Sequence, residues 1–189
     1  MKKFYALFFV LSIFAVNQNI FAAECPTPGE SQRVSTDELH EFIHHVQEHN
    51  DALNGNAIIE QCFMANIDYW YVDQLRTIKN GFRATPFDHE NDRSTSINRI
   101  LWEFFDLKKR YLFTDEAIRL AHLFVSPLVA NEVIEVFVME NKIDLTREQV
   151  TKLVENLHAD HHDDRSQFYG KYQTAERIWL DWGTRETVL

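Results

Sequence analysis

The feature that most constrains the fold is a helical spacing of apolar residues that recurs from residue 35 almost to the C-terminus. Ser35 and Glu38 have the capping-box pattern that begins a helix, and Thr146 and Gln149 repeat it far along the chain. After the first box, apolar residues recur at helical spacing at Leu39, Phe42, Ile43, Val46 and Leu53. Five glycines and four prolines leave few points at which helices could break. The sequence therefore predicts an all-α fold, a single-domain bundle of about seven helices.

The seven expected helices lie in segments near 35–53, 58–81, 97–112, 114–125, 127–139, 146–157 and 168–182. Pro127 suits the first position of a helix, but the VIEVFVM run at 133–139 is β-prone, so a strand there is the alternative. In the last segment we expect one stripe of residues to face the core, namely Phe168, Tyr172, Ala175, Trp179 and Trp182.

The first residues have the pattern of a secretory signal peptide. Lysines at positions 2 and 3 precede the apolar run 4–16, and small residues follow at the expected cleavage point after Ala22. We therefore expect residues 1–22 to be removed and residues 23–189 to form the helical domain. The apolar run is too short to span a membrane, and no later segment is free of charges for long enough. The expected location is the periplasm or the extracellular space.

The net charge limits the classes of partner that the chain can bind, and the two cysteines indicate a disulfide. The formal net charge is −10, and it becomes −12 if Lys2 and Lys3 are removed with the signal peptide. Such a chain repels nucleic acid and anionic lipid, so neither is an expected partner. Cys25 and Cys62 are expected to form a structural disulfide, because an oxidising compartment favours pairing and the C-x-x-C spacing of a redox pair is absent.

The stretch HEFIHHVQEH, His40 to His49, contains the H-E-x-x-H pattern. This short stretch resembles the helix of the zincin metallopeptidases, in which two histidines one turn apart bind zinc and the glutamate activates the bound water. The resemblance implies that His40 and His44 are zinc ligands and that Glu41 is the general base. A third ligand could be Glu60 on the next helix, in an arrangement loosely similar to that of the gluzincins.

Two observations weigh against a peptidase. The positions of the metzincin glycine and third histidine hold Gln47 and Asn50, and no strand pattern precedes Ser35, although zincins place a sheet before this helix. Glu41/His44 and Glu155/His158 also share the E-x-x-H spacing of di-iron bundles, but both pairs lie away from the apolar stripe of their helix. The alternative is that the histidines form the solvated face of an ordinary helix.

The sequence thus favours an exported acidic helical protein that acts by binding another protein, as accessory, inhibitor or immunity proteins do, and no cofactor is expected. The first alternative is a zinc-dependent hydrolase of the peptidase type, built on His40, Glu41 and His44. The second alternative is a metal-binding protein without catalysis that uses the same ligands.

Overall fold

The structure is a computed structural model that describes residues 25–26, 34–83, 90–158 and 165–184, except for the side chains of 90–96 and 165–169. These residues form eight α-helices, one short 3-10 helix and no strand. The elements are α2 (Thr36–His49), α3 (Ala52–Ala65), η1 (Ile67–Tyr69), α4 (Val72–Gly81), α5 (Glu90–Lys108), α6 (Thr114–Ala121), α7 (Pro127–Asn141), α8 (Arg147–Glu155) and α9 (Arg165–Gly183). The predicted all-α fold is confirmed. The expected signal peptide, residues 1–22, lies outside the described residues.

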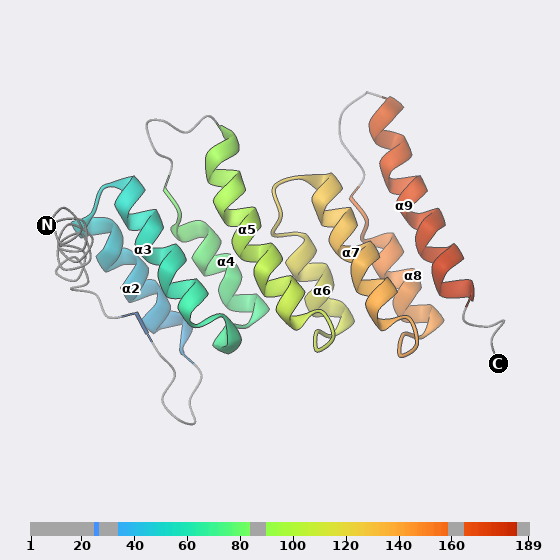
Figure 1. Cartoon of the computed structure of the whole chain (residues 1–189), viewed down its shortest axis with the longest axis horizontal. Coiled ribbons are helices and arrows are strands. Elements are labelled where there is room, and N and C mark those ends of the chain that lie inside the picture. Colours follow the sequence, from blue (N-terminus) through green and yellow to red (C-terminus); the bar gives the residue numbers. More distant parts are fainter. Residues whose placement is uncertain (1–24, 27–33, 84–89, 159–164, 185–189) are drawn as a thin grey trace, which may run out of the picture.

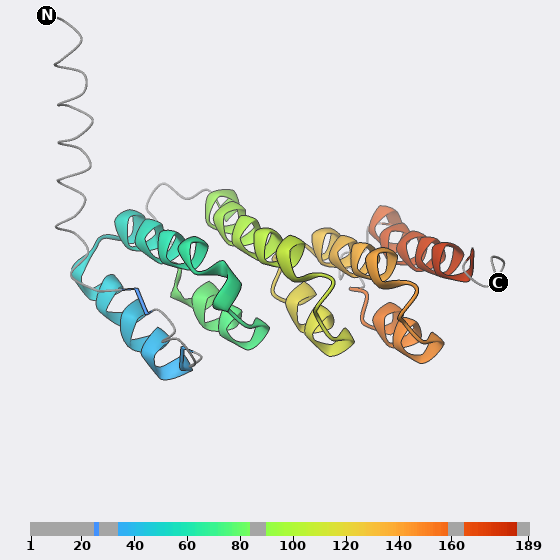
Figure 2. The ribbon, with the colours of Figure 1, turned by 60° about the horizontal axis from the view of Figure 1, so that its bottom comes forward.

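The helices alternate between two layers along an elongated molecule. Helices α2, α4, α6 and α8 form one layer, and α3, α5, α7 and α9 form the other (Figures 1 and 2). Within the layers, α2 packs on α4, α4 on α6, α6 on α8, α3 on α5 and α7 on α9. Helices that are close in sequence are therefore close in space, as in a solenoid of stacked helix pairs.

One continuous apolar core lies between the two layers, and large aromatic side chains fill it. Phe63 of α3, Phe104 and Phe105 of α5 and Phe137 of α7 are at most 1% exposed. The run at 133–139 is helical and lies inside α7, so the strand alternative is excluded. Its β-branched residues Val133 and Ile134 are fully buried, which shows that tertiary burial overrides their strand propensity.

The expected second helix is in fact two helices, and this part of the sequence prediction is wrong. Helix α3 ends at Ala65, and α4 begins only at Val72. Two side chains occupy the carbonyls that would have continued α3: the amide of Asn66 donates to the Cys62 carbonyl at 3.1 Å, and the indole of Trp70 donates to the Phe63 carbonyl at 3.0 Å. The chain is thereby turned into the other layer.

The disulfide between Cys25 and Cys62 is present, as predicted, with 5.5 Å between the two Cα atoms. It attaches the segment before α2 to the last turn of α3. Helix α3 also begins earlier than expected, because Asp51 accepts a hydrogen bond from the Asn54 amide at 2.8 Å and acts as the N-cap. Leu53 therefore belongs to α3, where it is 68% exposed, and not to the apolar stripe of α2.

The stripe predicted for the last helix is correct in part. Trp182 is buried and Ala175 and Trp179 are half-buried, but Tyr172 is 60% exposed. The side chain of Phe168 lies outside the described residues. Thr174 and Ile178 are also buried on this face, and neither belongs to the predicted stripe.

Candidate functional site

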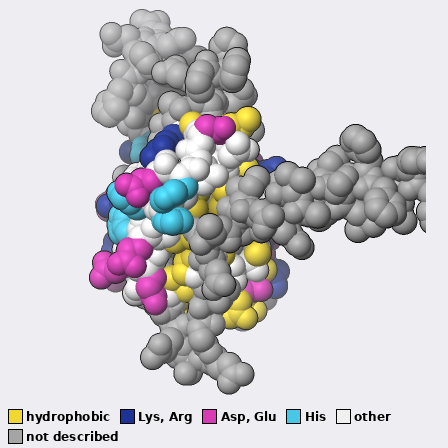
Figure 3. Space-filling view, turned by 90° about the vertical axis from the view of Figure 1, so that its left-hand side faces the viewer, with side chains coloured by type: hydrophobic (Ala, Val, Ile, Leu, Met, Phe, Trp, Pro, Cys, Tyr) yellow, Lys and Arg dark blue, Asp and Glu magenta, His cyan; other side chains and the backbone are white. Residues whose placement is uncertain are grey.

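The histidine-rich motif lies on the outer helix at one end of the stack. Leu39, Phe42, Ile43 and Val46 of α2 face the core, and His40, Glu41 and His44 are exposed on the other side. Nδ1 of His44 lies 3.3 Å from a carboxylate oxygen of Glu48. Figure 3 shows histidine and acidic side chains gathered on this end face. The predicted orientation of the helix is therefore correct.

The structure does not assemble the predicted zinc ligands. Glu60 on α3 forms an ion pair with Arg99 on α5, away from the exposed face of α2. Within the described part of the chain, no group of three histidine, cysteine, aspartate or glutamate side chains is placed to hold a metal ion. His40 and His44 thus share a helix face with Glu41, but Glu60 is not brought to them.

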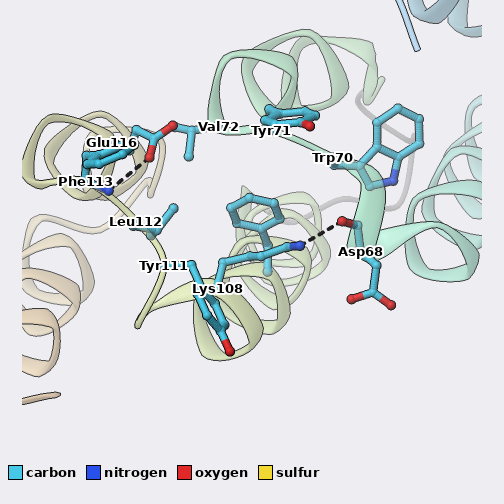
Figure 4. A pocket seen from close by; sticks show the side chains of 10 residues that line it. Asp68, Trp70, Tyr71, Val72, Lys108, Tyr111, Leu112, Phe113 and Glu116 are labelled. Atoms are coloured by element: carbon cyan, nitrogen blue, oxygen red, sulfur yellow. Dashed lines mark hydrogen bonds between the residues drawn. The ribbon is translucent and has the colours of Figure 1, made fainter. Parts of the chain in front are cut away.

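A cleft of about 250 Å³ lies elsewhere, where η1, α4, α5 and α6 meet (Figure 4). Its lining residues are Asp68, Trp70, Tyr71, Val72, Phe104, Lys108, Tyr111, Leu112, Phe113 and Glu116. The buried rings of Trp70 and Phe104 and the side chain of Val72 form its apolar base. The break between α3 and α4 creates one wall, and the turn between α5 and α6 creates the other.

Aromatic rings that remain open to solvent surround this base. Tyr71 is 47% exposed, Tyr111 is 81% exposed and Phe113 is 77% exposed. The helix expected near residues 97–112 would have contained Tyr111, but α5 ends at Lys108. The missed signal is the run Lys108–Phe113, KKRYLF, in which aromatic residues directly follow a charged helix end.

Polar contacts hold the chain segments around the cleft in place. The ammonium group of Lys108 donates to the Asp68 carbonyl at 2.7 Å and so connects α5 to η1. The backbone amide of Phe113 donates to a carboxylate oxygen of Glu116 at 3.0 Å, which fixes the start of α6. Both contacts are visible in Figure 4. The rings therefore project from chain segments that these two contacts hold together.

Further contacts join the α5–α6 turn to the end of α7. Arg110 donates to one carboxylate oxygen of Glu140 through Nε and Nη2, at 3.1 and 3.0 Å. The side-chain amide of Asn141 donates to the Lys109 carbonyl at 2.9 Å. A hydrogen bond to Asp106 raises the pKa of Lys109, which therefore stays charged beside its partner. Lys109 and Arg110 are thus paired with acidic side chains beside the cleft, whose own lining combines aromatic rings with Asp68, Lys108 and Glu116.

Comparison with known proteins gives no further assignment: no protein-family model matches the chain, and no curated protein or solved structure matches it significantly. None of the helices in the described ranges has both the length and the apolar character that crossing a bilayer requires.

Proposed function

We propose that this protein is an exported binding protein that holds a partner protein through the aromatic cleft between η1, α4, α5 and α6. The observation that carries the proposal is the group of three exposed rings, Tyr71, Tyr111 and Phe113, above an apolar base. Aromatic side chains leave much apolar area in water when they are exposed, and they are enriched among the residues that dominate binding energy at protein interfaces.

The size and surroundings of the cleft favour a protein partner over a small metabolite. Its volume of about 250 Å³ is below the roughly 300–1,000 Å³ typical of small-molecule sites. The α3–α4, α5–α6 and α7–α8 junctions lie along one edge of the stack (Figure 1). Further apolar side chains at or near these junctions are exposed. They are Tyr69 before α4, Leu107 near the end of α5, and Met139 and Ile143 at the α7–α8 junction. A protein surface could place one or two apolar side chains in the cleft and cover this edge.

The disulfide supports the exported location, since such bonds persist in oxidising compartments. The acidic net charge of −10 disfavours nucleic acid as the partner. No specific observation favours zinc hydrolysis, because His40, Glu41 and His44 lie on an exposed helix face and Glu60 is paired with Arg99.

Site-specific photo-crosslinking in the cells that produce the protein tests the proposal. A photoreactive phenylalanine analogue replaces Tyr111, and in a matched control it replaces Leu53, an apolar residue near the end of the stack that is 68% exposed, against 81% for Tyr111. We expect a discrete crosslinked protein from position 111 that is absent from position 53 and is lost when Phe113→Ala is added. Equal crosslinking from both positions, or none from position 111, would contradict the proposal.

The captured partner then allows a quantitative test. We expect Tyr111→Ala to weaken its binding by about 10- to 100-fold, the range for a residue at the centre of an interface. Leu53→Ala should leave the dissociation constant unchanged. The helical circular dichroism of both variants serves as the control for folding.

A further inference from the structure

We propose that His45 and His49 form a two-imidazole binding site for a divalent transition-metal ion such as Zn²⁺, Ni²⁺ or Cu²⁺. The two residues lie one turn apart at the C-terminal end of α2, and Figure 3 shows histidine side chains on this end face of the molecule. It differs from the H-E-x-x-H pair in its residues, and it is independent of the aromatic cleft.

The two rings lie side by side on the helix. Their centroids are 4.2 Å apart and their planes are tilted by 31°. A metal ion held at Zn–N distances of about 2.0–2.1 Å needs its two nitrogens roughly 3.3 Å apart in tetrahedral geometry, so metal binding requires the rings to turn from this contact until both lone pairs point at one ion. In the described part of the chain, no comparable ring contact joins His40 to His44, although these residues have the same spacing.

A backbone contact fixes the tautomer that a metal ligand needs. Nδ1 of His49 lies 2.9 Å from the carbonyl oxygen of His45. A carbonyl can only accept, so this nitrogen carries the proton, and the lone pair of the neutral ring is on Nε2. Ligating histidines commonly donate their second ring nitrogen to a carbonyl in this way, which orients the ring and selects the tautomer.

The surroundings suit a cation. Glu41 lies one helical turn before His45, and Glu48 lies beside His49 in sequence on the same exposed end of α2. Because no set of three potential ligands exists among the described residues, water completes the coordination of the metal. Imidazole ligands with open positions suit zinc, nickel and copper better than calcium or magnesium.

The test is a titration of the untagged mature chain with Zn²⁺ and with Ni²⁺, followed by calorimetry and by thermal unfolding. The reference protein and all variants carry His161→Gln and His162→Gln. These changes remove a second pair of histidines, adjacent in the sequence and outside the described residues, that could bind metal themselves. We expect one site per chain and a rise in the unfolding temperature with added metal, because the metal binds the folded state.

His45→Gln should weaken this binding at least tenfold, and it leaves the backbone carbonyl that orients His49 in place. His49→Gln should have the same effect, whereas His40→Gln, the matched control, should leave the affinity unchanged. Unchanged affinity in His45→Gln, or a loss in His40→Gln equal to that in His45→Gln, would overturn the assignment. Selective loss of metal binding in the two predicted variants, with unchanged helical content, would establish it.

Discussion

Gln74 joins the start of α4 to the segment that precedes α2. Its side chain is completely buried; its amide nitrogen donates to the Val34 carbonyl at 2.7 Å, and its amide oxygen accepts from the Tyr71 backbone amide at 3.0 Å. A buried polar side chain is stable only when its hydrogen-bonding groups are satisfied. This residue therefore fixes both the N-terminus of α4 and the entry of the chain into α2.

We predict that Gln74→Ala lowers the free energy of unfolding by about 2–4 kcal/mol, because it leaves the buried Val34 carbonyl and the partly buried Tyr71 amide without their partner. Gln149 provides the matched control. It occupies the same position at the start of α8, where it accepts from the Thr146 amide at 2.8 Å, but it is only half-buried. Gln149→Ala should lower the free energy of unfolding by only about 0.5–1 kcal/mol. Urea unfolding measures both, and equal losses would contradict this account.

The sequence could not reveal the role of Gln74. The residue follows Asp73 in an ordinary polar stretch of helix, and its partner Val34 is 40 positions away. By contrast, the capping boxes at Ser35/Glu38 and Thr146/Gln149 were readable because both partners lie within one turn. Short-range hydrogen bonds leave a pattern in the sequence, and long-range ones do not.

Helices α2 and α4 are tightly packed against each other at Gly81. A Cβ atom added there would lie 2.8 Å from Cγ2 of Ile43, and the Gly81 carbonyl accepts a hydrogen bond from the side chain of Gln47. Glycine is therefore required at this position by space, and not by an unusual backbone angle, since no described glycine has a positive φ.

We predict that Gly81→Ala destabilises the protein by about 1–3 kcal/mol, the usual cost of adding a carbon to a filled core. Gly183→Ala is the matched control, because a Cβ at that helix end would meet nothing within 4 Å. Gly183→Ala should change the free energy of unfolding by no more than about 0.5 kcal/mol. Thermal unfolding of the two variants decides the matter: a neutral Gly81→Ala would show that α2 and α4 can move apart freely.

Helix positions were predictable from apolar spacing and caps, but the break after α3 was not. Cys62, Ala65, Val72 and Leu75 continue a plausible helical pattern across the gap. The side chains of Asn66 and Trp70 bind carbonyls in the last turn of α3, where the helix ends. The spacing of apolar residues does not reveal these hydrogen bonds. The cleft was missed for the same reason, because it depends on where α3 and α5 end.

The whole molecule is held together by contacts between neighbours in the stack, so a local change should have a local effect. The Cys25–Cys62 disulfide closes a loop with a sequence separation of 37 at one end of the molecule. On the chain-entropy model, a bridge of this span stabilises a fold by about 4 kcal/mol. In a solenoid this stabilisation belongs mainly to the units that contain the bridge.

We predict that reduction of the disulfide increases amide hydrogen exchange in α2 and α3 and leaves α7 and α9 nearly unchanged. Hydrogen exchange with mass spectrometry, comparing oxidised and reduced protein, provides the measurement. At the far end, an ion pair joins Arg177 of α9 to Glu135 of α7, and reduction of the disulfide leaves this contact in place. An equal loss of protection in all helices would show that the stack unfolds as a single unit.

The two-layer stack also bears on how quickly the chain can fold. Each helix packs mainly against the helices that follow or precede it by one or two places. The chain therefore closes short loops, and folding rates rise as the sequence separation between contacting residues falls. A newly made chain can begin to fold at any helix pair and extend in both directions, without waiting for its two ends to meet.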